Sequence, residues 1–377
     1  MEYENLLITG GKVIDPAGHF RGPQNLRIRE GRLAEISPNL EPQEDEKVIS
    51  LQGEWVVPGL IDIHVHSYPE KTNLGIAPDR IGLSQGVCLI ADAGSAGSDT
   101  FRDFYRDIIA PAHTRVVSWI NISRPGLCQG NAELADLSNL DPEGVVRLAQ
   151  EFTDVICGVK VRVSSSVLGE NGITPLVIAK EAGRKSNLPL MVHIGNGPPF
   201  LEEILPLLTR GDVVTHGFHG KKGGLVDGSP ELFRLYKEAL ARGVYLDIGH
   251  GQASFSFQAL EKALAAGIFP SSISTDIHVR NIDGPVYSMV KTIDKMRAAG
   301  FSLEEVIGLS TLNPAQIIGL DDSYGTLTIG NPARITILQE LERSQVLVDS
   351  EGESRELSTQ LEAVWVIHEG KVWDLQC

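Results

Sequence analysis

Two histidines close an apolar run in the stretch VVPGLIDIHVHS, residues 56 to 67. Such a run is typical of a buried parallel strand. Because residues two apart lie on one face of a strand, the imidazoles of His64 and His66 should point the same way. Imidazole is a good ligand for zinc and similar ions, so the pair predicts one edge of a metal site. A lone histidine at a strand end is more often a hydrogen-bonded structural residue, so the prediction needs further ligands.

Four more residues of this kind stand in or at the ends of other apolar runs. They are Lys160 in VICGVKVRV, His193 in LPLMVH, His216 in DVVTH and Asp276 in SSISTD. Taken singly, the lysine could form a surface ion pair and the aspartate could cap a helix. If the runs end at one edge of one sheet, the imidazoles and the carboxylate together suit a divalent metal with an open position for water. An ammonium group is not a ligand, so Lys160 stays unexplained at this point.

The strands that would carry these residues alternate with stretches of helical spacing. Eight strand-like runs can be read, at 55–64, 86–92, 114–121, 155–163, 188–193, 212–216, 243–248 and 271–276. Helical spacing is clear at 142–152, 174–186, 230–243 and 257–267. Repeated strand–helix units predict an α/β fold with a parallel sheet, and eight of them predict a (β/α)₈ TIM-type barrel. In such a barrel the chemistry lies at the carboxyl ends of the strands.

Both ends of the chain have short alternating strands broken by turns, such as NLRIREGRLAEI and AVWVIHEGKVWD. We therefore expect a small β-sandwich domain built from residues 1–54 and 321–377, with the barrel over residues 55–320.

Composition narrows the classes of partner. The 377 residues are 42% hydrophobic and 22% charged, as expected of a globular protein with a large core. The net charge of −16 and the lack of a basic run argue against a nucleic-acid partner. A small-molecule substrate is therefore the favoured partner. We find no signal-peptide pattern and no apolar run of about 18 residues, so we expect a cytoplasmic protein without a membrane partner; a homo-oligomer stays open.

Cys88, Cys128, Cys157 and Cys377 show neither metal nor disulfide spacing and are expected to be thiols, mostly buried.

VVPGLIDIHVH resembles the strand-one signature of the amidohydrolase superfamily. GVKVRVS, PLMVHIG, DVVTHGFHG and ISTDIH follow in the order expected of that superfamily, and GTLTIGNPARITIL is similar to its closing segment. The resemblance covers nearly the whole chain. One departure is Arg334, which follows Ala333 where aspartate is common, and it concerns the small domain rather than the site.

This resemblance implies a role for Lys160. The lysine would be carboxylated by CO₂, and the resulting carbamate would bridge two metal ions, expected to be zinc. His64 and His66 would hold one ion with Asp276, and His193 and His216 would hold the second. Some members keep one metal, so the number of ions stays open. The reaction would be hydrolysis of an amide or ester, with Asp276 as general base and then general acid.

Several segments resemble the deacetylase-like branch more than hydantoinases or dihydroorotases. They are GVKVRVSSSVLG, HIGNGPP, HGFHGKKGG, DIGHGQASFSF and STDIHVRNIDGP. The resemblance implies removal of an acyl group, above all acetyl, from a small carboxylate-bearing substrate such as an acylated hydroxy or amino acid.

Three residues are candidates for substrate contact. Arg162 shares a strand face with Lys160, so its guanidinium could bind a substrate carboxylate, or with equal weight form a salt bridge to a barrel carboxylate. His250 and Arg280 also lie near strand ends. His219 and His278 are interpreted as loop residues.

Other functions have less support. A cyclic amide hydrolase of the hydantoinase or dihydroorotase type would use the same metals. A non-catalytic scaffold is disfavoured because it has no need for six polar residues in a barrel mouth. A serine nucleophile among residues 164–166 is disfavoured because no GxSxG turn surrounds them.

Overall fold

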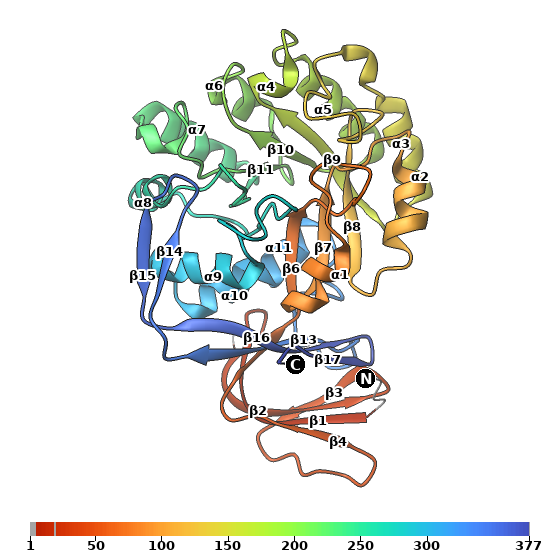
Figure 1. Ribbon diagram of the computed structural model, residues 1–377, viewed down its shortest axis with the longest axis vertical. Coiled ribbons are helices and arrows are strands. Elements are labelled where there is room, and N and C mark those ends of the chain that lie inside the picture. Colours follow the sequence, from red (N-terminus) through yellow and green to blue (C-terminus); the bar gives the residue numbers. More distant parts are fainter. Residues whose placement is uncertain (1–4, 19, 377) are drawn as a thin grey trace.

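The computed structural model describes residues 5–18 and 20–376 and consists of a barrel beside a mixed sheet. Figure 1 shows the red N-terminal strands and the blue strands β13, β16 and β17 together below the barrel, which is built from the middle of the chain. The predicted fold class is confirmed.

Seven parallel strands form most of the barrel, in the order β12-β11-β10-β9-β8-β7-β6. They are β6 (Leu60–Val65), β7 (Val87–Ala93), β8 (Arg115–Asn121), β9 (Ile156–Val163), β10 (Leu190–Ile194), β11 (Val213–Thr215) and β12 (Tyr245–Leu246).

The eighth predicted strand is not a regular strand, yet residues 272–277 close the barrel. Ser272 forms a parallel bridge with Asp247, and Ile277 forms one with Val65 in β6. The backbone N–H of His66 donates to the carbonyl of Ile277 at 3.1 Å, and the N–H of Asp276 donates to the carbonyl of His64 at 2.7 Å. The end of the chain's last barrel segment is thereby held against the end of the first.

Helices form the outer layer of the barrel. They are α1 (Pro78–Ile81), α2 (Phe101–Phe104), α3 (Pro142–Glu151), α4 (Ser165–Leu168), α5 (Thr174–Ser186), α6 (Leu201–Ile204), α7 (Pro230–Ala241), α8 (Phe257–Ala265), α9 (Met289–Ala298), α10 (Leu303–Ser310) and α11 (Leu312–Ile317). The four helices expected from sequence are confirmed as α3, α5, α7 and α8. Several begin at serine caps, for example Ser229 before α7 and Ser256 before α8, whose side chains accept backbone N–H bonds. None of the helices in the described ranges is both long and apolar enough to span a membrane.

The mixed sheet has its own core. Its strands are β1 (Asn5–Asp15), β2 (Phe20–Arg29), β3 (Arg32–Ser37), β4 (Lys47–Ser50), β5 (Trp55–Pro58), β13 (Arg334–Leu341), β16 (Gln360–His368) and β17 (Lys371–Asp374). The order is β17-β16-β13-β5-β1-β2-β3, with β4 beside β1. Leu6, Ile28, Ile335 and Ile367 are among the residues buried in a core separate from that of the barrel.

Two parts of the chain are arranged differently from the sequence prediction. The run 55–64 is split at Gly59, because β5 pairs with β1 and β13 in the mixed sheet while β6 starts the barrel. Both halves are fully buried, so their apolar pattern is continuous. Within residues 321–377, a hairpin of β14 (Gln345–Val348) and β15 (Ser354–Leu357) forms a sheet of its own and packs against α9.

The cysteines within the described ranges, Cys88, Cys128 and Cys157, are free thiols, as expected. Cys88 is fully buried, which raises the pKa of its thiol to about 12. Cys128 and Cys157 are partly exposed, and Cys377 lies outside the described residues.

Candidate metal centre

All six residues predicted as metal ligands meet at the carboxyl ends of the barrel strands. His64 lies in β6 and His66 directly follows that strand. Lys160 lies in β9, His193 in β10, and His216 directly follows β11. Asp276 belongs to the segment that closes the barrel.

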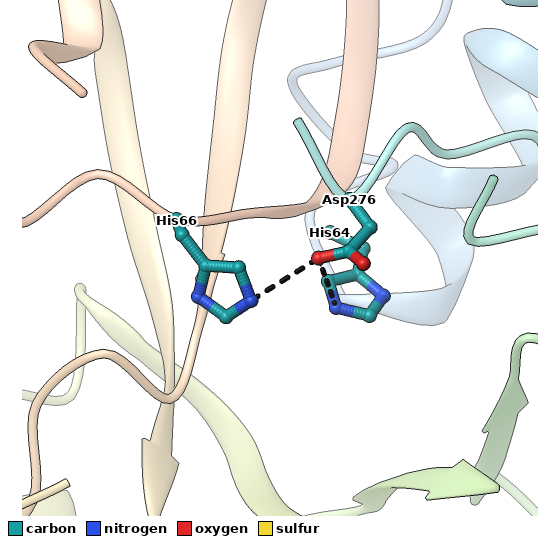
Figure 2. A group of neighbouring side chains, drawn as sticks. All are labelled: His64, His66 and Asp276. Carbon is teal, nitrogen blue, oxygen red and sulfur yellow. Dashed lines mark ion pairs between the residues drawn. The ribbon is translucent and has the colours of Figure 1, made fainter. Parts of the chain in front are cut away.

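Asp276 contacts both His64 and His66. Its Oδ1 atom lies 3.1 Å from Nε2 of His66 and 3.4 Å from Nε2 of His64. Figure 2 shows the two imidazoles converging on this carboxylate. The candidate ligand atoms of the three residues all lie within 4.8 Å of one another, as expected of a site that could hold one metal ion.

The other three residues extend this group. The Nζ atom of Lys160 lies 3.2 Å from Nε2 of His64. The ring of His216 lies 4.4 Å from that of His193 between centroids, and its Nε2 atom is 4.0 Å from Oδ2 of Asp276. That Nε2 atom is buried and has no hydrogen-bond partner among the described residues. A buried nitrogen that faces a carboxylate without a donor or acceptor fits a metal ligand.

Burial sets the protonation states that a metal requires. It lowers the pKa of His64 and His193 well below the ordinary value and that of His216 to about 3. These imidazoles are neutral at pH 7 and have a lone pair to offer. Burial raises the pKa of Asp276, but the neighbouring His64 and His66 outweigh that effect, so the pKa lies well below its usual range. The donor set is thus suited to a divalent cation.

Outer hydrogen bonds aim the imidazoles inward. Nδ1 of His64 lies 2.8 Å from Oγ1 of Thr215, and that hydroxyl donates to Asp247 at 2.7 Å. Since the hydroxyl proton goes to Asp247, Nδ1–H of His64 is the donor to Thr215, and Nε2 keeps its lone pair. Nδ1 of His216 likewise donates to the carbonyl of Gly249. Such outer partners commonly fix the tautomer of a metal-binding histidine.

Two of the six residues have an unusual backbone. His216 has φ 65° and Asp276 has φ 50°, in the left-handed region that residues other than glycine rarely occupy. Strain of this kind persists where the surrounding structure imposes it, and it clusters at functional sites.

Five of the six residues, all except His216, line a cavity of about 170 Å³. Its wall consists of His64, His66, Leu74, Lys160, Arg162, His193, Gln252, Ala253, Ser254, Asp276 and His278. This volume is suited to a small substrate rather than a polymer.

Arg162 lies in the cavity wall and also forms a salt bridge, so its position is compatible with both of the interactions considered from sequence. Its Nη1 atom donates to both carboxylate oxygens of Glu133, at 3.0 and 3.3 Å, and to the carbonyl of Asn131 at 3.3 Å. The Glu133 side chain is almost wholly buried. Glu133 belongs to the irregular segment after β8, and no sequence pattern singled it out.

His250 and Arg280, the other two candidates for substrate contact, lie outside the cavity wall. His250 is fully buried, accepts a hydrogen bond from Lys295 at 2.7 Å and is absent from the cavity wall. Arg280 is exposed and also absent from the wall. His278, interpreted from sequence as a loop residue, does line the cavity, with its ring 6.3 Å from that of His66. His219 is buried outside the wall.

Comparison with known proteins agrees with this fold. Residues 55–354 match the model of the amidohydrolase family. The chain is similar to a deacetylase of Enterococcus faecalis, with 37% identity over 99% of this chain and 100% of that protein.

Two solved structures superpose over nearly their whole length. One is described as an adenine deaminase, with 37% identity, a TM-score of 0.91 and coverage of 99% of this chain and 100% of the other. The second is described as a dihydroorotase, with 32% identity, a TM-score of 0.91 and coverage of 98% and 99%. The chain belongs to the amidohydrolase family and is a metal-dependent hydrolase.

Proposed function

We propose that this enzyme removes an acyl group, above all acetyl, from a small carboxylate-bearing molecule such as an acylated hydroxy or amino acid. The observation that carries the proposal is the 37% identity with a protein named deacetylase, over essentially the full length of both chains. The position of Arg162 in the cavity wall supports it, because a guanidinium binds carboxylates well.

The proposed cofactor is a pair of zinc ions. His64, His66 and Asp276 would hold one ion, and His193 and His216 would hold the other. When bound, such ions lower the pKa of water and polarise a carbonyl group. The five side chains supply nitrogen and oxygen donors of the kind that zinc prefers.

Lys160 would join the two ions as a carbamate. Burial lowers the pKa of Lys160 to about 7, so a large share of its amine is neutral near that pH. Only a neutral amine can attack CO₂; the new N–C bond forms with loss of one proton and leaves an anionic carbamate. This turns a group that repels cations into an oxygen ligand.

Proton transfer and substrate binding would then depend on Asp276 and Arg162. Asp276 accepts a proton from the attacking water through its carboxylate and returns it to the leaving nitrogen or oxygen. Arg162 holds the substrate carboxylate and thereby orients the acyl group toward the cluster.

The test is an assay of purified enzyme, with measured zinc content, on matched N-acetyl amino acids and O-acetyl hydroxy acids. We expect hydrolysis that falls to background after metal removal and returns with zinc. Full activity in protein with only trace divalent metal would refute the proposal. So would zinc-loaded enzyme that acts on no acylated acid.

A cyclic amide is the second candidate, favoured by the structural likeness to the protein described as a dihydroorotase. Dihydroorotate and hydantoins belong in the same assay. Adenine is included because the other similar structure is described as an adenine deaminase. The substrate class with the highest kcat/KM decides among the three.

A further inference from the structure

The tip of the β14–β15 hairpin, residues 349–353, comes from a distant part of the chain and contacts a barrel segment that lines the metal cavity. In Figure 1 the blue strands β14 and β15 rise from the mixed sheet to α8 on the barrel. The hairpin leaves the mixed sheet entirely, since its two strands pair only with each other among the described strands. The tip is thereby free of the mixed sheet and contacts loops of the barrel.

Ser350 makes three hydrogen bonds to one barrel segment. Its backbone N–H donates to the carbonyl of Phe255 at 3.1 Å. Its hydroxyl donates to the carbonyl of Gly251 at 3.2 Å and accepts from the N–H of Phe255 at 3.4 Å. The contacts fall at the two ends of residues 251–255. The serine thus holds both ends of this short segment.

The residues between those ends form part of the cavity wall. Gln252, Ala253 and Ser254 all line it. Gly251 has φ +58°, and a Cβ atom there would lie 2.7 Å from Oδ2 of Asp276. The backbone of the segment is consequently packed directly against the carboxylate, and its position affects the shape of the cavity.

The tip itself is firmly anchored. Asp349 is buried and accepts hydrogen bonds from the N–H groups of Phe257, Glu351 and Glu353, at 2.9, 2.8 and 2.9 Å. The side chain of Glu351 packs against Gly220, in the loop that follows His216. Because these contacts fix the tip, the hydrogen bonds of Ser350 can hold residues 251–255 in one position.

We infer that Ser350 is a positioning residue, which fixes the cavity wall at residues 252–254 and so sets the fit of the substrate. Its kinetic consequence rests on the proposed function, whereas its structural consequence does not.

The structural test compares hydrogen exchange in Ser350→Ala and wild type, without substrate. Loss of the hydroxyl removes two bonds, so amide exchange in a peptide covering residues 251–257 should rise about fivefold or more. Ser354→Ala is the matched control, because Ser354 is exposed on β15 of the same hairpin. Equal exchange in the two variants would overturn the inference.

The kinetic test uses the fastest substrate from the acylated-acid, cyclic-amide and adenine panel. Ser350→Ala should raise KM about fivefold, with kcat within twofold and unchanged metal content, and Ser350→Thr should recover most of the effect because it keeps a hydroxyl. A fall in kcat and metal content with unchanged KM would overturn the inference. If wild type acts on none of these compounds, the proposed function fails, and the exchange result alone decides the role of Ser350.

Discussion

Nζ of Lys160 lies 3.2 Å from Nε2 of His64, so a buried amine directly faces a nitrogen expected to bind a metal. A positive charge at this place would repel the ion, whereas a carbamate would bind it. We expect Lys160→Ala to lose most bound metal and to lower kcat/KM by at least about 100-fold. Short carboxylic acids such as acetate or propionate should restore part of both, because they can replace the carbamate oxygens.

The measurements are metal content per chain and activity across a range of added acid. Lys180→Ala serves as a control, since that lysine pairs with Asp212 and lies outside the cavity wall. Retention of metal and activity in Lys160→Ala would contradict carbamate ligation.

Asp276 is expected to accept the proton of the attacking water. Asp276→Asn keeps the shape of the side chain but removes the proton acceptor, so we expect kcat to fall about 100-fold to 10,000-fold while part of the metal stays bound. Steady-state kinetics and metal analysis on the same preparation check this. An asparagine variant with near-normal kcat would exclude Asp276 as the base.

Glu133 should affect substrate binding through Arg162. The buried carboxylate holds Nη1 of Arg162 at 3.0 Å, and Glu133→Gln weakens that hold. We expect KM for an acylated acid to rise about tenfold, with a smaller change in kcat. The matched control is the corresponding primary amide of the substrate, whose KM should be nearly the same in the variant and wild type. Equal increases for acid and amide would show that Glu133 acts on something other than recognition of the carboxylate.

Lys295 gives a prediction on stability and pH. Burial lowers its pKa to about 7 from an ordinary value of 10.5. Between these values the unfolded chain binds more protons than the folded protein, so this group makes the free energy of unfolding rise with pH. Lys295→Met should reduce the rise by up to about 1.4 kcal/mol per pH unit. Urea unfolding of both proteins at pH 7, 8 and 9, with equal metal content, tests this; parallel trends would contradict it.

The sequence was informative where side chains follow a regular period. His64, His193 and His216 end apolar strands, and parallel strands of a barrel end at one rim, so their meeting could be predicted before their distances were known. The pattern could not separate β5 from β6, because burial on both faces gives each the same apolar character. It also could not place the β14–β15 hairpin, since alternation marks a strand without marking its partner.

The irregular segments were beyond such reasoning. Glu133 and residues 252–254 reach the cavity through loops whose backbone follows no period. His250 is the opposite case: its place near a strand end suggested substrate contact, but its side chain is buried and bonded to Lys295 instead. A strand end predicts the rim of the barrel, and the rotamer decides whether the side chain faces the cavity.

The closure of the barrel by residues 272–277 has a consequence for how the enzyme matures. This segment joins β6 on one side and the end of β12 on the other, and it carries Asp276. A chain in which residues 272–277 have not yet paired with these neighbours does not place Asp276 beside His64 and His66, and thus has no complete site. Only a molecule whose barrel is closed therefore has the complete site that catalysis needs. Metal binding at that site stabilises the closed barrel relative to the open one.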